Sequence, residues 1–168
     1  MPAVLRRIAR TLRAGAVTCV FCEIVAGGRS ASRIWEEDDC LAFMDLYPVS
    51  PGHALIVPRR HAVLLTDLAP EIRGRLFEVA GAVRAAAASA GYGVAGANVL
   101  LNDGVAANQH IRHVHVHVVP REPGDRVRVS FAFLRRVFNS FGGRARRPTL
   151  DRTADILRPL VAERLGPR

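Results

Sequence analysis

Four histidines lie within one short segment, NQHIRHVHVHVVPR, at residues 108–121. Three of them, His113, His115 and His117, alternate with valines. Side chains alternate across a strand, so this spacing predicts a strand with three imidazoles on one face and valines on the other. The outer two positions lie about 13 Å apart, which suits a single ion poorly. We therefore expect different roles for the three rings, one as a nucleophile and a neighbour as a donor to an anion, rather than a polar surface face.

The loop that precedes these histidines, LLNDGVAANQH, is rich in groups that can hold an anion. Asn102, Gln109 and His110 offer neutral or switchable donors, and Gly104 permits a close approach of the backbone. Neutral donors hold a phosphate without the strong charge pairing that slows product release. The loop therefore supports a phosphate site beside the histidines, although alone it is a weak signal.

The three cysteines divide into a pair and a single residue. Cys19-Val-Phe-Cys22 is a C-x-x-C knuckle, which supplies two ligands where a structural zinc needs four. A redox pair and two core cysteines are the alternatives. Cys40 lies in an apolar stretch and is expected in the core. An odd number of cysteines without an export signal favours a reducing compartment, the cytoplasm.

Five stretches of the chain predict strands. They are a segment ending at Ile34 and Trp35, then CLAFMD, HALIVP, ANVLLND and the histidine segment. They follow one another as hairpin-like neighbours with few helices between them, which is typical of an antiparallel α+β domain. We therefore predict a five-stranded antiparallel sheet with one main helix and a C-terminal helical extension.

The main helix should begin near Thr66 or Asp67, either of which can cap it, with Pro70 in its first turn. Its apolar face is expected at Leu68, Ile72, Leu76, Val79, Val83 and Ala87. Gly91 and Gly93 should end it. No apolar run approaches the length of about 18 residues that a membrane-spanning helix needs.

The chain carries a formal charge of +9, and every one of its 24 basic residues is arginine. We divide it into a basic N-terminal extension at 1–17, a catalytic domain at 18–121 and an arginine-rich helical extension at 122–168. Within the last part, apolar residues recur near helical spacing, and Pro159 should interrupt the second helix. Those residues are Phe131, Leu134, Phe138 and Phe141, then Ile156, Leu160 and Leu165. The extension could bind nucleic acid, but we expect it to pack on the domain or on a dimer partner.

The blocks above resemble, in order, those of the histidine triad (HIT) family of nucleotide-binding hydrolases and transferases. His113-Val-His115-Val-His117-Val-Val matches the family's H-x-H-x-H-x-x pattern. CVFCEIVAG, CLAFMDLYPVSPGHALIVPRRH and NVLLNDG are similar to the blocks that precede it. The resemblance spans about residues 18–121, and its ordered blocks are more specific than the triad alone.

The resemblance implies a covalent mechanism on a purine nucleotide. His115 would attack the α-phosphorus and form a nucleotidyl-histidine, which water would then hydrolyse. The implied substrate is a nucleoside phosphoramidate, an acyl-nucleotide or a dinucleoside polyphosphate, and the chemistry needs no metal. His117, His110 and Asn102 would hold phosphate oxygens, Gln109 would lie near the leaving atom, His53 would complete the histidine cluster, Asp45 would bind the ribose, and Leu46, Phe43 and Ile24 would surround the base.

The resemblance also implies a structural zinc bound by Cys19, Cys22, His61 and His113, and a homodimer whose sheets join. Two residues depart from the family pattern: Asn108 stands where glycine is usual, and His110 stands where a small residue is common. These departures affect the choice of leaving group. The alternatives are a non-catalytic nucleotide-binding or interaction module with the same fold, and a nucleic-acid-binding protein that uses its positive charge.

Overall fold

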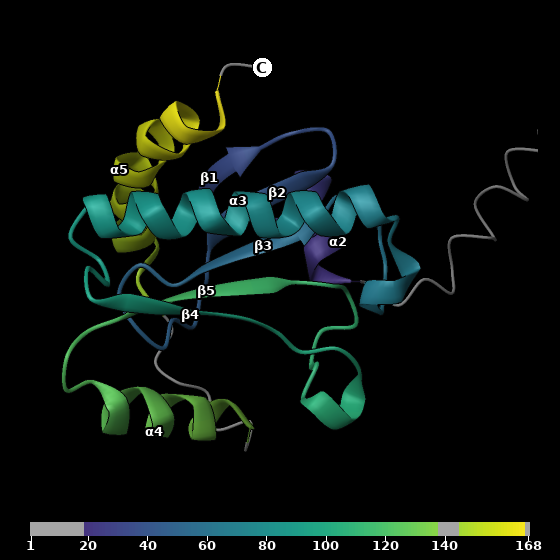
Figure 1. Ribbon diagram of the computed structural model, residues 1–168. Coiled ribbons are helices and arrows are strands. Elements are labelled where there is room, and N and C mark those ends of the chain that lie inside the picture. Colours follow the sequence, from purple (N-terminus) through teal and green to yellow (C-terminus); the bar gives the residue numbers. More distant parts are fainter. Residues whose placement is uncertain (1–18, 138–144, 167–168) are drawn as a thin grey trace, which may run out of the picture.

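A five-stranded antiparallel sheet organises the protein, as the strand patterns predict. The computed structural model describes residues 19–137 and 145–166, and its strands lie in the order β1-β2-β3-β5-β4 (Figure 1). They are β1 (Arg33–Glu36), β2 (Cys40–Met44), β3 (Ala54–Pro58), β4 (Gly96–Leu101) and β5 (Val116–Arg121). The predicted N-terminal extension, Phe138 and Phe141 lie outside the described residues.

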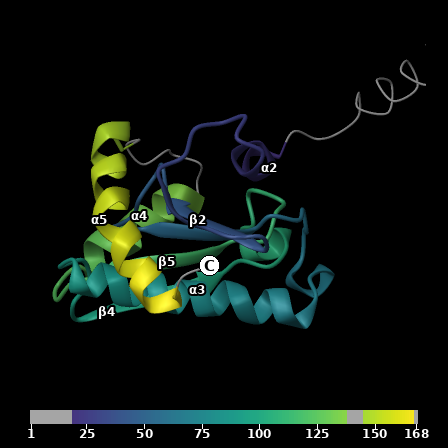
Figure 2. The same cartoon turned by 90° about the horizontal axis from the view of Figure 1, so that it is seen from above.

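The two faces of the sheet are covered by different helices. Helix α3 (Pro70–Ser89) lies across one face, and the short α2 (Val20–Val25) lies on the other, as the view from above shows (Figure 2). The long α5 (Arg147–Leu165) runs past the β1 edge and reaches both sides. Helix α4 (Arg126–Val137) lies below β4, and two 3-10 turns, η1 (Leu65–Asp67) and η2 (Val105–Ala107), complete the described elements.

The alternation of side chains along the strands separates two apolar clusters. On the α3 side, Val114, Val116 and Val118 pack into the main core, so the valines of the histidine segment do share one face. The expected face of α3 is also confirmed, since Leu76, Val79, Val83 and Ala87 are fully buried. On the other face, β2 and β3 contribute Leu41, Phe43, Leu55 and Val57, which pack against α2.

Four details differ from the expectations. Helix α3 begins after Ala69 without a side-chain cap, because Asp67 instead accepts from the Leu64 amide at 2.9 Å and closes η1. Strand β5 begins only at Val116, so His117 is the one triad histidine inside it. Pro159 does not interrupt α5, which continues to Leu165. The buried face of α5 is Leu150, Thr153, Ala154, Leu157 and Val161, whereas Ile156 is exposed.

Helix α4 also packs differently from the predicted spacing. Val129 is its buried residue, and it contacts Val49 and Val119. Phe131 and Leu134 are 59% and 51% exposed, so they do not form the face that packs on the sheet. Their spacing is helical, but the side of α4 that packs on the sheet is the one that carries Val129, next to Val119.

One carboxylate connects the β1–β2 turn to the main helix. Glu37 accepts both Nε and Nη2 of Arg75 on α3 at 2.8 Å, together with Nε1 of Trp35 at 2.8 Å. The Cys40 thiol is a further donor at 3.1 Å. Arg75 is the main cause that lowers the pKa of Glu37 to about 2, against an opposing effect of burial. The turn is therefore held to α3 by a nearly buried, bidentate ion pair.

We predict that Glu37→Gln destabilises the protein at pH 7 by about 2 kcal/mol, because the charged acceptor is lost while its donors stay buried. The folded-state pKa is depressed, so the stabilisation is present above the ordinary value of 4.5 and is lost as the pH falls toward about 2. Urea unfolding at several pH values measures the difference between variant and parent.

The matched control is Glu78→Gln. Glu78 also pairs with Arg75, at 2.8 Å, but its side chain is 61% exposed, so its loss should cost less than about 0.5 kcal/mol. A difference for Glu37→Gln that stays constant down to pH 2 would contradict the assigned cause.

Candidate functional site

The imidazoles of the triad are oriented by backbone carbonyls. Nε2 of His113 donates to the carbonyl of Pro58 at 2.9 Å, and Nδ1 of His115 donates to the carbonyl of His113 at 2.7 Å. A carbonyl only accepts, so each bond places a proton on the nitrogen that makes it. His113 is thereby left with a lone pair on Nδ1, and His115 with a lone pair on Nε2.

The third triad histidine is oriented by His53, from the turn before β3. The Val49 amide donates to Nδ1 of His53 at 3.2 Å, so the ring proton of neutral His53 lies on Nε2. That Nε2 is 3.0 Å from Nδ1 of His117 and 3.5 Å from Oδ2 of Asp45. The shorter contact identifies His117 as the acceptor. His117 then carries its own proton on Nε2, as a donor.

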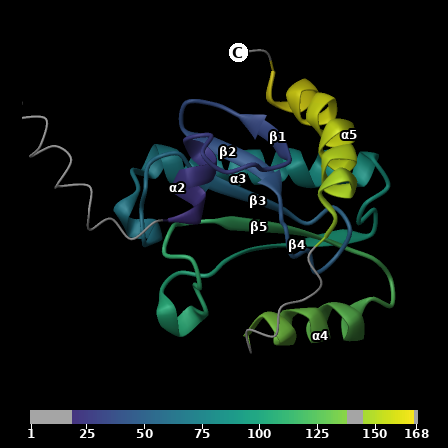
Figure 3. The ribbon, with the colours of Figure 1, turned by 180° about the vertical axis from the view of Figure 1, so that it is seen from behind.

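A cavity of about 480 Å³ opens on the α2 face of the sheet, a size typical of small-molecule sites. Figure 3 shows α2 on this face of the sheet, and Phe21 and Ile24 from α2 line the cavity. His115 and His117 also line it, although they are only 7% and 5% exposed. Their ring centroids lie 4.9 Å apart. The two rings are thus buried from bulk solvent and face an enclosed space together.

Most of the predicted site residues meet at this cavity. Besides the two histidines, its lining includes Ile24, Phe43, Asp45 and Leu46. Asp45 is 3% exposed, and its Oδ1 accepts from the Tyr47 amide at 2.8 Å. The lining thus includes two imidazoles, one carboxylate and an apolar floor, groups that can bind the phosphate, the ribose and the base of a nucleotide.

Four predicted residues lie outside the cavity lining: His53, which contacts His117, and three on the segment between β4 and His113. Nε2 of Gln109 donates to the carbonyl of Val63 at 2.6 Å, and its Oε1 accepts from Gly104 at 3.0 Å. Nδ2 of Asn102 reaches the carbonyl of Asn108 at 3.4 Å, and His110 is exposed. Of this segment, Ile111 reaches the cavity.

Sequence reasoning missed several lining residues. Phe21 is one, and its place between the two cysteines was an available signal. Its ring lies 5.2 Å from that of His115 and 5.8 Å from that of His113. Tyr47, Arg29 and Arg147 also line the cavity. Arg147 begins α5, far along the chain, and no local pattern connects it to the histidines.

The four predicted metal ligands form one cluster. Cys19, Cys22, His61 and His113 each offer one ligand atom, and these atoms lie within 4.8 Å of one another. Nδ1 of His113 is 3.4 Å from Sγ of Cys19 and 3.6 Å from Sγ of Cys22, while Nδ1 of His61 is 3.2 Å from Sγ of Cys22. Tetrahedral zinc with its usual bond lengths separates sulfur and nitrogen ligands by about 3.6 Å.

The electrostatics of the cluster also suit zinc. Burial lowers the pKa of His113 to about 4, more than the Pro58 carbonyl raises it, so this ring is neutral near pH 7 and can donate its Nδ1 lone pair. Burial and the adjacent Cys19 raise the pKa of Cys22 to about 11. A bound cation therefore has to displace the thiol proton. The residues present fit a Cys2His2 zinc site.

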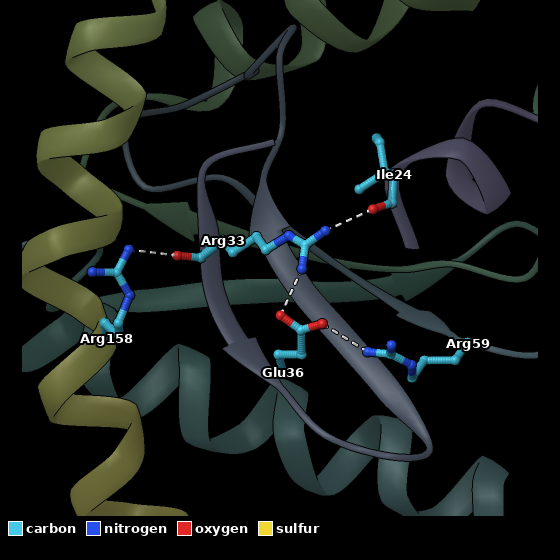
Figure 4. Close-up of polar contacts among 5 residues, drawn as sticks. All are labelled: Ile24, Arg33, Glu36, Arg59 and Arg158. Atoms are coloured by element: carbon cyan, nitrogen blue, oxygen red, sulfur yellow. Dashed lines mark hydrogen bonds and ion pairs between the residues drawn. The ribbon is translucent and has the colours of Figure 1, made fainter. Parts of the chain in front are cut away.

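The short α2 is tied to the sheet edge by an arginine (Figure 4). Nη2 of Arg33 on β1 donates to the carbonyl of Ile24 at 2.8 Å, while its Nη1 pairs with Glu36 at 2.6 Å. Glu36 in turn accepts from Arg59 at 2.8 Å. The wall of the cavity that contains Ile24 is thus fixed at one end by Cys19 and Cys22 of the metal-ligand cluster and at the other end by Arg33.

These features define a protein with a nucleotide-sized pocket that presents oriented histidines on an antiparallel sheet. The sequence matches the HIT domain over residues 27–124. It is 37% identical over 145 residues to an uncharacterized HIT-like protein of Mycobacterium tuberculosis, covering 86% of this chain and 94% of that protein. The chain belongs to the HIT family.

Two further relatives and one solved structure are informative. An adenylylsulfatase of Arabidopsis thaliana is 36% identical over 111 residues, covering 64% of this chain and 54% of its own length. An adenosine 5′-monophosphoramidase of Schizosaccharomyces pombe is 35% identical over 105 residues, covering 62% and 75%. The crystal structure of a zinc-bound histidine triad family protein from Mycobacterium smegmatis has a TM-score of 0.65 and 36% identity, and covers 89% of this chain and 96% of its own.

We predict about one zinc per chain in protein purified without chelators. Cys22→Ser should lose it and lower the free energy of unfolding by about 4 kcal/mol when free zinc is a thousandfold above its dissociation constant. Plasma emission spectrometry and thermal unfolding measure the two quantities.

Cys40→Ala is the matched control for the zinc prediction. Cys40 is a fully buried core cysteine of β2 and does not belong to the cluster. Its variant should keep the metal even if it unfolds at a lower temperature. Stoichiometric zinc in Cys22→Ser would show that the ion is bound elsewhere.

Proposed function

We propose that this HIT protein is a nucleotide hydrolase or transferase that acts at the α-phosphate through a covalent nucleotidyl-His115 intermediate. The observation that carries the proposal is the orientation of His115: its Nδ1 donates a hydrogen bond to a backbone carbonyl, so its lone pair is on Nε2, in a ring that lines the cavity. The substrate class is a nucleoside phosphoramidate, an acyl-nucleotide or a dinucleoside polyphosphate. The activities named for the plant and yeast relatives support this class.

Several residues in and around the cavity have roles in this scheme. His117, with its proton on Nε2, holds a phosphate oxygen, and His53 positions it from behind. Asp45 accepts from the ribose hydroxyls, and the apolar floor at Phe43 contacts the base. His115 attacks phosphorus, the leaving group departs with a proton, and water then releases the nucleoside monophosphate. The structural zinc lies outside this sequence of steps and holds α2 in place.

We further propose that Asn102, Gln109 and His110 act on the leaving-group side. They precede Ile111, which lines the cavity, so the segment that bears them borders the open end of the site. Gln109 uses one amide hydrogen on Val63 and keeps a second for the leaving atom. This segment is also where the chain departs from the family pattern, at Asn108, which adopts a left-handed conformation with φ 62°.

We predict that His115→Gly lowers kcat for an adenosine or guanosine phosphoramidate by at least about a thousandfold, because the nucleophile is removed. Added imidazole should restore part of the rate, since it can replace the missing ring in the space left. Rapid quenching of the parent protein followed by mass spectrometry should show an adduct of one nucleotidyl group. A His115→Gly variant that binds nucleotide and turns over at the parental rate would refute the assignment.

The alternative is a nucleotide-binding module with no chemistry. It predicts tight binding of nucleoside monophosphate but no product from a broad panel of phosphoramidates, acyl-nucleotides and dinucleoside polyphosphates. A buried imidazole that lines the cavity with its lone pair on Nε2 favours the enzyme, because a binding module needs no oriented nucleophile. A nucleic-acid-binding protein would instead lose affinity steeply with salt.

We also propose a homodimer formed at the β4 edge of the sheet. Helix α5 covers the β1 edge, where Nη2 of Arg158 donates to the carbonyl of Arg33 at 3.1 Å. At the opposite edge of the described sheet, Val99 of β4 is 42% exposed. An open apolar edge strand readily pairs with another chain.

None of the helices in the described ranges is long and apolar enough to cross a membrane.

We expect light scattering after size exclusion to show a dimer of the parent protein and a monomer for Val99→Asp, because a carboxylate would be buried at the joined edge. Val105→Asp is the control, since Val105 is 75% exposed on η2 and away from the edge strand. Dimers that persist at micromolar concentration in Val99→Asp would exclude this edge.

A further inference from the structure

A residue of the C-terminal extension contributes to the lining of the cavity. Arg147, the first residue of α5, lines the cavity although it lies outside the region that matches the HIT domain. Its Nη1 donates to Oγ of Ser32 at 3.3 Å and its Nη2 to the carbonyl of Ser30 at 3.1 Å. The amide of Ala145 donates to the carbonyl of Leu46 at 3.0 Å, beside Asp45. The guanidinium is therefore held in place.

The strand register shows where this guanidinium lies relative to the triad histidine His117. His117 is opposite Leu55, Leu55 is opposite Phe43, and Phe43 is opposite Arg33, which adjoins Ser32. Adjacent strands are about 4.8 Å apart, so Arg33 lies about 14 Å from His117 across the sheet. The cavity thus runs from the imidazoles over an apolar floor to Arg147.

A nucleotide laid along this cavity brings the far edge of its base toward Arg147. The phosphate lies at the imidazoles and the base on Phe43 and Leu55, so the groups that remain for Arg147 are those on the edge of the base. A guanidinium has five N–H donors and no acceptor. Two of them are used on Ser30 and Ser32, which leaves three.

We propose that Arg147 determines base specificity and selects 6-oxopurine nucleotides, those of guanine and hypoxanthine, over adenine nucleotides. A 6-oxopurine presents two adjacent acceptors, O6 and N7, which match the guanidinium fork. Adenine presents N7 beside the N6 amino donor, which meets the guanidinium as donor against donor. This inference rests on the proposed function, since it assumes that the phosphate occupies the histidine end.

The test compares kcat/KM for guanosine and adenosine phosphoramidates. The parent protein should prefer guanosine by about tenfold, the size of one bidentate base contact. Arg147→Met should remove the preference, and Arg147→Lys should remove most of it, because an ammonium keeps the charge but lacks the fork. A purely structural role, in which Arg147 only fastens α5 to Ser30 and Ser32, would slow both substrates equally and leave their ratio unchanged.

Arg158→Met is the matched control. Arg158 lies on the same helix and also donates to a backbone carbonyl (Figure 4). It is outside the cavity lining. Its variant should keep the parental ratio. A parent protein without base preference, or an Arg147→Met variant that keeps the preference, would overturn the inference. If Arg147→Met lowered kcat/KM equally for guanine and adenine substrates, and did so only for dinucleoside polyphosphates, Arg147 would contact a phosphate instead of the base.

Calorimetric binding of GMP, IMP and AMP separates this inference from the proposed function. GMP and IMP should bind about equally and about tenfold tighter than AMP, and Arg147→Met should equalise all three. This order of affinities, found in a protein that turns over none of the substrates, would refute the proposed reaction at His115 but leave the base specificity of Arg147 intact. Turnover that depends on His115, with equal affinity for the three nucleotides, would refute the specificity alone.

Discussion

Two hydrogen bonds from imidazoles to backbone carbonyls, at the entrance to β5, determine what the histidine segment can do. Nε2–H of His113 donates a hydrogen bond to the carbonyl of Pro58, and Nδ1–H of His115 donates one to the carbonyl of His113. The two rings therefore present opposite nitrogens. The Nδ1 lone pair of His113 points toward Cys19 and Cys22. The Nε2 lone pair of His115 belongs to a ring that lines the cavity. If either bond were absent, the tautomer would be free to change, and so would the division between the proposed metal ligand His113 and the proposed nucleophile His115.

The short α2 depends on the same arrangement. A helix of six residues is not stable alone, so its place is set by what it contacts. Cys22 contacts His113, and Phe21 packs against both His113 and His115. The carbonyl of Ile24 accepts a hydrogen bond from Arg33. The cluster of Cys19, Cys22, His61 and His113 and the wall of the cavity are consequently one packed unit, so an ion bound at the cluster would also fix the wall.

The C-terminal helix is part of the same architecture. Leu157 and Val161 of α5 are fully buried in the core on the α3 side, while Arg147 at its start lines the cavity on the α2 side. The helix passes around the β1 edge and so contributes to both faces. A segment outside the matched HIT domain thereby contributes to both the core and the pocket.

Short-range patterns were sufficient to predict the sheet and the buried face of α3, whereas the clustering of two cysteines with two histidines was implied by the resemblance to the family. Strand alternation assigns residues to faces, and the ordered blocks carry the rest through their resemblance to a family. They could not show that His115 precedes β5, that Gln109 turns toward Val63, or that Ile156 is exposed while its neighbour Leu157 is buried. Each of these outcomes depends on which distant groups compete for one side chain, and spacing along the chain does not record that competition. Arg147 shows the limit most clearly, because it reaches the cavity only through the path of α5 around the sheet edge, which arises when the whole core packs.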